Sequence, residues 1–176
     1  GMCSSSEYGP MPDWDVSKVT NMYQAFYQKS TFNGDLSKWN VSKVTNVEGM
    51  FHGASSFNQM IGGWDTSSVT TMSSMFFEAS KFNQPIGGWD VSSVSTMIVM
   101  FFYASSFRQD VSLWRGTGAN RPHTNMFLGA DKFKTAYSCV DVNDGPPTSC
   151  VQTGPNPPPP PSPSPPPSSS GARRAA

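Results

Sequence analysis

Hydrophobic residues recur along this chain with a period of 25 residues. Five tryptophans mark the period, at Trp14, Trp39, Trp64, Trp89 and Trp114. With each tryptophan counted as position 1 of a repeat, apolar residues recur at positions 3, 6, 9, 13, 19 and 23, as in Val91, Val94, Met97, Phe101, Phe107 and Val111. Four full repeats in register indicate structural units whose apolar side is covered by neighbouring repeats.

The spacing inside a repeat predicts one short helix and one very short strand. Apolar residues at positions 6, 9, 12, 13 and 16 follow the three-and-four rhythm of a helical face, and position 7 is a threonine or serine, a preferred N-cap. Positions 1 to 3 alternate apolar, polar, apolar, as a strand does. The run Ile86-x-x-Trp89-x-Val91 matches the spacing of a leucine-rich repeat. The predicted fold is an α/β solenoid, leucine-rich-repeat-like, with short parallel strands and short helices and a C-terminal polyproline II tail.

The same pattern divides the chain into four segments. Residues 1–13 form an N-terminal flank or partial coil, and residues 14–114 form four 25-residue repeats. Residues 115–150 keep Met126, Phe127 and Phe133 shifted by one place, as in a degenerate repeat that serves as a C-terminal cap. Residues 151–176 form a proline- and serine-rich stalk, because ten of the thirteen residues from Pro155 to Pro167 are proline.

The repeat resembles that of the BspA-like leucine-rich repeat surface proteins. The resemblance rests on the run from Phe82 to Met97, on Met100-Phe101 and on Ala104-Ser105-Ser106-Phe107, and it extends over about Asp13 to Phe133. It implies a leucine-rich-repeat-like solenoid in a surface or adhesion setting, with no shared catalytic residues.

The tail resembles the hydroxyproline-rich glycoproteins of plant and algal cell walls. That resemblance implies proline hydroxylation and O-glycosylation at Pro157, Pro158, Pro159, Pro160, Pro161, Ser162, Pro163, Ser164, Pro165, Pro166 and Pro167. An unmodified linker and a ligand for an SH3-like groove are the alternatives. A further glycosylation acceptor is Asn40, in the sequence Asn40-Val41-Ser42.

Charge and hydropathy narrow the expected partners. Twelve basic residues balance twelve acidic ones, so no broad field would gather nucleic acid. No run approaches the ~20 apolar residues that a membrane span needs. The expected partners are further copies of the chain or other surface proteins and glycans, with no nucleic acid, no membrane span and no cofactor.

Three cysteines suggest one disulfide. Cys139 and Cys150 flank a turn-rich stretch short enough to be closed by a bond, with two free thiols as the alternative. Cys3 is left over, and its partner is another chain, an upstream segment or none. No metal site is expected, because zinc needs four ligands and the two histidines, His52 and His123, lie far from the cysteine pair in sequence.

A polar row on the predicted sheet face is the candidate binding site. It is formed at positions 2 and 4 of the repeats by Asp15, Asn40, Asp65, Asp90, Ser42, Ser67 and Ser92. As a site, this row would take a carbohydrate, a peptide or a cation. As plain structure, the same groups would solvate the sheet face and hydrogen-bond nearby turns.

Asparagines recur at position 20 of the repeats, at Asn33, Asn58 and Asn83. We expect their side chains to bond the backbone at the corners of the repeats, which would otherwise be left unpaired inside.

The sequence carries no set of acid, base and nucleophile, so we expect no enzyme. Two functions are expected instead, and both place the chain outside the cell, at the cell surface or in the cell wall. The first is a structural role in a surface coat or filament. The alternative is an adhesion module that binds carbohydrate or protein and is displayed on the proline-rich stalk.

Overall fold

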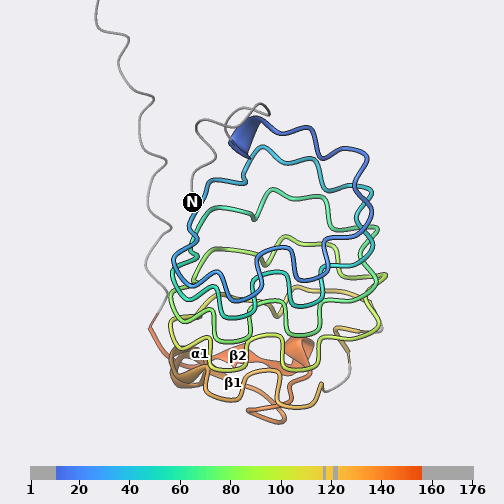
Figure 1. The fold of residues 1–176 in the computed structure, drawn as a ribbon. Coiled ribbons are helices and arrows are strands. Elements are labelled where there is room, and N and C mark those ends of the chain that lie inside the picture. Colours follow the sequence, from blue (N-terminus) through green and yellow to red (C-terminus); the bar gives the residue numbers. More distant parts are fainter. Residues whose placement is uncertain (1–10, 117, 121–122, 156–176) are drawn as a thin grey trace, which may run out of the picture.

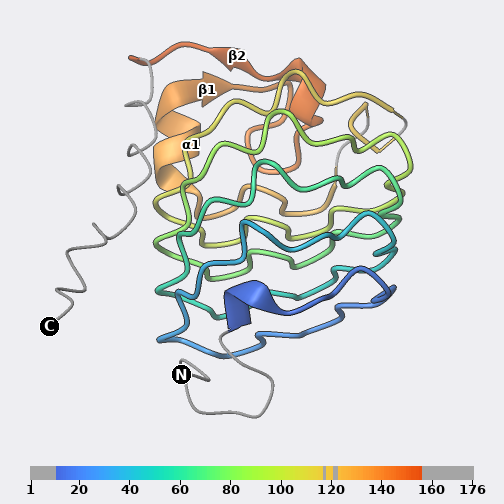
Figure 2. The same cartoon turned by 90° about the horizontal axis from the view of Figure 1, so that it is seen from above.

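The structure, a computed structural model, describes residues 11–116, 118–120 and 123–155. The repeats lie one on another as layers in chain order, from the N-terminal layer to the C-terminal segment that holds α1, β1 and β2 (Figure 1). The same order is seen after a rotation by 90° (Figure 2). The regular elements are η1 (Met11–Asp13), α1 (Asp131–Ala136), β1 (Tyr137–Ser138), η2 (Pro147–Ser149) and β2 (Val151–Gln152). Strand β1 pairs with β2 in antiparallel register, Tyr137 opposite Gln152 and Ser138 opposite Val151.

The predicted α/β, leucine-rich-repeat-like solenoid of short parallel strands and short helices is wrong. Within the described residues the only strands are β1 and β2, which are antiparallel, and the only α-helix is the six-residue α1. The four repeats contain neither element. They consist of turns, and parallel pairing between them is limited to isolated bridges at one position, Asn21, Asn46, Thr71 and Thr96. The expected polyproline II tail lies outside the described residues, apart from its first proline.

Every second backbone N–H between positions 9 and 15 joins one layer to the next. Gln24, Phe26 and Gln28 donate to the carbonyls of Glu48, Met50 and His52 at 3.0, 2.9 and 2.7 Å. The N–H groups between them close tight turns within the layer, from Ala25 to Met22 and from Tyr27 to Gln24. The phenylalanine bond recurs at 2.9 Å from layer to layer, Phe51 to Met75, Phe76 to Met100 and Phe101 to Met126. Each layer therefore supplies the acceptors that its predecessor needs.

This alternation excludes the predicted helix. Positions 11 and 15 have positive φ in each repeat, for example 53° at Gln24 and 56° at Gln28. A right-handed helix cannot pass through such residues, whereas a type II turn requires one at its third place. Because overlapping turns return apolar residues to the same side every three or four places, the spacing looks helical. The threonines at position 7 also do not cap helices, since Thr45 and Thr70 donate to the equivalent carbonyl one layer back.

The core is built around two columns of stacked phenylalanines. Rings at position 13 follow one another at 5.5–5.8 Å, and rings at position 19 at 5.7–6.2 Å. Within a layer the two rings lie 3.9–4.2 Å apart. Such contacts contribute about 0.5–1.5 kcal/mol each beyond the area they bury. Each tryptophan from Trp39 to Trp114 ties the core to the layer before it, because its indole N–H donates to a carbonyl 28 residues earlier.

The asparagine row at position 20 serves the backbone, as predicted. The side-chain oxygen of Asn33 accepts the N–H of Asn58 at 2.8 Å, and that of Asn58 accepts the N–H of Asn83 at 2.8 Å. The side chain of Asn83 does the same for Arg108. The prediction that these side chains bond the backbone at the corners of the repeats is confirmed.

A loop covers the open N–H groups of the last layer. We call residues 140–146 the cap loop. His123 and Phe127 donate to the carbonyls of Asp144 and Asn143, both at 2.7 Å, and the carboxylate of Asp144 accepts the N–H of Asn125 at 2.7 Å. A disulfide between Cys139 and Cys150 encloses this loop, and Cys3 lies outside the described residues. The cap loop therefore accepts the hydrogen bonds that the carbonyls of a further layer would otherwise accept.

The first residues of the predicted stalk are hydrogen-bonded to the rest of the fold. The N–H groups of Thr153 and Gly154 donate to the carbonyl of Ala136 at 2.8 and 3.0 Å. Arg108, which replaces the asparagine of position 20, donates from its guanidinium to the carbonyl of Pro155. The predicted O-glycosylation positions from Pro157 to Pro167 lie outside the described residues.

Adjacent glycines at Gly62 and Gly63 give a matched test of how closely the layers approach. A methyl group added at Gly62 would lie 2.2 Å from the carbonyl oxygen of Pro85 in the next layer, whereas one added at Gly63 meets no atom within 4 Å. We expect Gly62→Ala to lower the free energy of unfolding by about 1–3 kcal/mol. Gly63→Ala should raise it by about 0.4–1 kcal/mol, because it restricts the unfolded chain. Urea unfolding measures both, and equal effects would contradict this layer spacing.

Candidate functional site

The polar row predicted as a binding site acts first on its own turns. One side-chain oxygen of Asp15, Asp65 and Asp90 accepts the N–H of the serine two residues later, at 2.9, 3.1 and 2.8 Å. Asn40 accepts both the N–H and the hydroxyl of Ser42 in the same way. The side chains are exposed, except for the partly buried Ser42, but they lie on turns rather than on a sheet, because the repeats form no sheet. Their role in turns is therefore shown, while a binding role stays a prediction.

These bonds keep the row negatively charged. Hydrogen bonds from the serine hydroxyls, and then from the serine N–H groups, lower the pKa of Asp15, Asp65 and Asp90. At Asp65 the charge of Asp90 opposes this shift. Among the described residues no group of three or more His, Cys, Asp or Glu side chains is arranged to hold a metal ion.

A second surface feature, which the sequence analysis missed, is a column of aromatic rings at position 14. We call Tyr27, His52, Phe77 and Phe102 the aromatic column. Successive ring centroids lie 4.8, 4.3 and 4.6 Å apart. Tyr103 extends it with an edge-to-face contact to Phe102 at 4.7 Å. The available signal was an aromatic residue in all four repeats, directly after the core phenylalanine of position 13.

The aromatic column lies at the surface, unlike the core columns beside it, with Tyr27 exposed and His52, Phe77 and Phe102 partly buried. Tyr27 is 41% exposed and Tyr103 is 54% exposed, while the neighbouring Phe51, Phe76 and Phe101 have no exposed surface. Because His52, Phe77 and Phe102 stack nearly parallel, their faces cover one another. The surface that a partner would meet is made mainly of ring edges, which carry the positive side of the aromatic quadrupole.

His52 is the one imidazole in the aromatic column. Partial burial between Tyr27 and Phe77 lowers its pKa, and the nearby charge of Glu78 works in the opposite direction. The neutral imidazole is therefore the form that this column favours.

The other histidine is a structural residue. The Nδ1 of His123 accepts the N–H of Met97 at 3.3 Å, and its Nε2 lies 2.7 Å from the carbonyl of Gly118. A carbonyl only accepts, so Nε2 donates and the ring is neutral. His123 is buried in the fifth layer and His52 lies in the second, so the structure does not bring them together.

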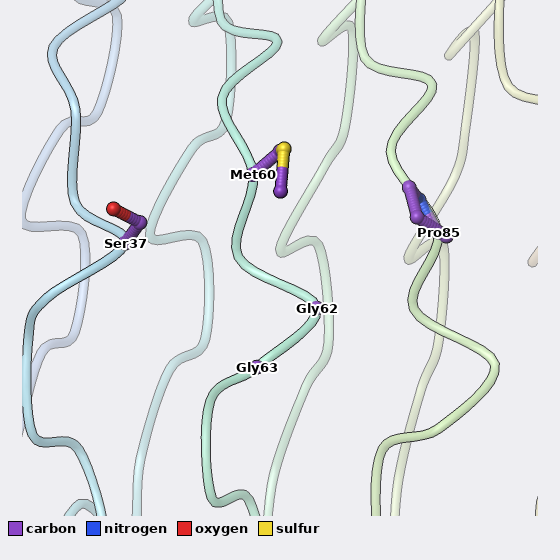
Figure 3. Close-up of a pocket in the computed structure, with 5 residues that line it drawn as sticks. All are labelled: Ser37, Met60, Gly62, Gly63 and Pro85. Atoms are coloured by element: carbon purple, nitrogen blue, oxygen red, sulfur yellow. The ribbon is translucent and has the colours of Figure 1, made fainter. Parts of the chain in front are cut away.

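A shallow apolar depression lies on another part of the surface. It is lined by Ser37, Met60, Gly62, Gly63 and Pro85, which come from three successive layers (Figure 3). The two glycines create it, because they carry no side chains. Its lining offers one hydroxyl, that of Ser37, and no ionisable group, so it contains no acid, base or metal ligand from a charged side chain.

No helix in the described ranges is both long and apolar enough to cross a membrane. The expected absence of an enzyme activity stays a prediction.

Comparison with known proteins yields one family. A family profile described as "Mycoplasma protein of unknown function, DUF285" matches residues 2–114 and, in a second overlapping match, residues 38–141. These matches cover well over half of the chain. No curated protein and no solved structure matches it.

The pKa of His52 predicts how stability responds to acid. Its folded pKa lies below the usual 6.5, so the unfolded chain binds more protons between the two values. The stability that the neutral ring contributes is present above pH 6.5 and is lost as the pH falls toward the folded pKa.

Urea unfolding at about pH 7.5 and about pH 5 tests this dependence. The His52→Phe variant should lose less stability on acidification than the unchanged protein. Phenylalanine occupies this place in two repeats, so the substituted ring fits the column. Equal losses would contradict the assignment.

Proposed function

The chain belongs to the family described as Mycoplasma protein of unknown function, DUF285, and from this premise we propose that it is a non-enzymatic binding module of the cell surface. In this proposal the aromatic column holds an extended apolar segment of a partner protein. The second of the two expected functions, the adhesion module, is thereby preferred to the first.

The observation that carries this proposal is the exposure of the aromatic column. A row of tyrosine and phenylalanine rings on the surface of a folded domain is typical of interaction sites. Tyr27 at one end of the column and Tyr103, which contacts Phe102 at the other end, are about half exposed. Tyrosine is among the residues that most often dominate binding energy. The rings are held by stacking between layers, so little ordering entropy is lost when a partner binds.

Ring geometry favours protein over carbohydrate as the ligand. The faces of His52 and Phe77 are covered by neighbouring rings, which leaves edges available. Ring edges attract carbonyl oxygens and methionine sulfur, and they pack against apolar side chains. A partner segment with alternating apolar side chains and backbone carbonyls supplies these groups.

The proposed setting is extracellular. It draws on the resemblance to BspA-like surface proteins and on the resemblance of the tail to cell-wall glycoproteins. The disulfide between Cys139 and Cys150 adds support, because such bonds persist in oxidising surroundings. Hydrogen bonds hold Thr153, Gly154 and Pro155, where the proposed stalk begins, against the C-terminal part of the fold.

Assembly into a coat or filament, the first expected function, receives less support. Growth through the C-terminal end would have to displace the cap loop, which occupies the N–H groups of His123, Asn125 and Phe127.

A comparison of two triple variants tests the proposal. One replaces Tyr27, Phe77 and Tyr103 by serine. The matched control replaces Asp15, Asp65 and Asp90 by asparagine, which keeps the turns because Asn40 already makes them.

Labelled protein is bound to intact cells of the source organism, untreated, trypsin-treated or periodate-treated. We expect the aromatic triple variant and trypsin treatment each to reduce binding about tenfold or more. The control variant and periodate treatment should leave it unchanged. Undiminished binding by the aromatic triple variant, or no binding by any form, would sink the proposal.

A further inference from the structure

The two ends of the stack of layers carry complementary hydrogen-bonding groups. Among the first four layers, N–H groups at positions 9, 11, 13 and 15 donate forward to carbonyls at positions 8, 10, 12 and 14 of the next layer. Between the fourth and fifth layers the acceptors are shifted by one residue, to Thr124, Met126 and Leu128, and the N–H of Met97 donates to Nδ1 of His123. The last layer therefore ends in donors and the first layer begins with acceptors. The acceptors of the first layer are the carbonyls of Asn21, Tyr23, Ala25 and Tyr27, to which none of the described residues donates.

The donors of the last layer are occupied within the same chain. Three of the four, the N–H groups of His123, Asn125 and Phe127, bond to Asn143 and Asp144 of the cap loop at 2.7 Å each. The ends of this loop are joined by a bridge between Asp141 and Gly145, with N···O distances of 3.0 and 2.9 Å. The cap loop thus takes the place that the carbonyls of a further layer would take.

The first layer carries a charge where the other layers carry a methyl group. Position 16 is Ala54, Ala79 and Ala104 in the inner repeats, and each of these has no exposed surface. In the first repeat the same position is Lys29, which is exposed. A layer placed on this end would enclose the lysine ammonium in a space that otherwise fits alanine, and a buried unpaired charge is strongly unfavourable. Charged residues of this kind protect open edges in many β proteins.

We propose that the cap loop and Lys29 together prevent copies of this chain from joining head to tail. Without them, the last layer of one copy would receive the first layer of the next. Donors would meet acceptors in the register that the layers already use, and the column that ends at Phe127 would continue into Phe26 of the next copy. Because such a contact is not closed by symmetry, it would produce linear polymers. The cap loop and Lys29 thus prevent association through the two ends of the stack. The sides of the stack remain accessible for binding partners.

The test uses four proteins that each begin and end as residues 1–176 do. They are the unchanged protein, Lys29→Ala, a cap-open variant that lacks Val142, Asn143 and Asp144, and the combination of both changes. The deletion joins Asp141 to Gly145, which already pair, and it leaves the disulfide in place. Sedimentation velocity gives the mass distribution of each protein over a range of concentrations. Near-ultraviolet circular dichroism shows that the aromatic stacks are intact.

We expect the unchanged protein and Lys29→Ala to remain monomeric. The combined variant should show a roughly fourfold or greater rise in average mass as its concentration is raised ~100-fold, as an open head-to-tail contact requires. The cap-open variant should associate more weakly, because Lys29 still opposes the contact. A combined variant that keeps its aromatic stacks and stays monomeric would overturn the proposal, and so would polymers formed by Lys29→Ala alone.

A mixing experiment separates head-to-tail joining from nonspecific aggregation. The Lys29→Ala variant can present its first layer to a polymer, but its own cap loop then blocks the next addition. It should therefore shorten polymers of the combined variant, whereas the unchanged protein should not. If the deletion unfolds the chain, aggregates will form that the Lys29→Ala variant does not shorten, and Asp144→Ala combined with Lys29→Ala then replaces the deletion. Folded polymers that both added proteins shorten equally, or that neither shortens, count against the proposal.

Discussion

The structure depends on the donation of every second backbone N–H from one layer to the next. In the segment from position 9 to position 15, one N–H closes a turn within the layer and the following one reaches the neighbouring layer. No layer can satisfy its backbone alone, because the acceptors lie 24 residues further along the chain. The aromatic columns follow from the same constraint, since equivalent residues must lie one above another. A repeat without its neighbours would leave both its N–H groups and its phenylalanines unpartnered.

This dependence assigns different roles to the ends and the sides of the molecule. The layer at each end of the stack has backbone groups that no further layer pairs. At the C-terminal end Asn143 and Asp144 accept hydrogen bonds from those N–H groups, and at the N-terminal end the charge of Lys29 opposes the addition of a layer. The sides repeat each exposed position in every layer, so any position becomes a row. One such row is acidic and hydrogen-bonds its own turns, and another is aromatic with its edges toward solvent. The aromatic row has no comparable task within the fold beyond its own stacking, which is why the proposed function rests on it.

The sequence was sufficient to predict the 25-residue unit, the buried residues of each repeat and the backbone role of Asn33, Asn58 and Asn83. It also suggested the pairing of Cys139 with Cys150, which the structure contains.

The sequence was not sufficient to predict the secondary structure, because overlapping turns and a helix give the same three-and-four spacing. The deciding residues have positive φ, and only Gly49 and Gly53 show this by their type. Val99 and Tyr103 adopt the same conformation although their side chains disfavour it, so neighbouring layers rather than local preference impose it. The aromatic column was missed because its residues directly follow the core phenylalanines and differ in type.

Scalar couplings across hydrogen bonds test the pairing of layers most directly. In protein labelled with ¹⁵N and ¹³C, each such coupling identifies the carbonyl that accepts a given N–H. This pairing of layers predicts couplings from the N–H of Phe51 to the carbonyl of Met75 and from that of Phe76 to the carbonyl of Met100. A coupling from Phe51 to the carbonyl of Val47, four residues earlier as in a helix, would contradict it.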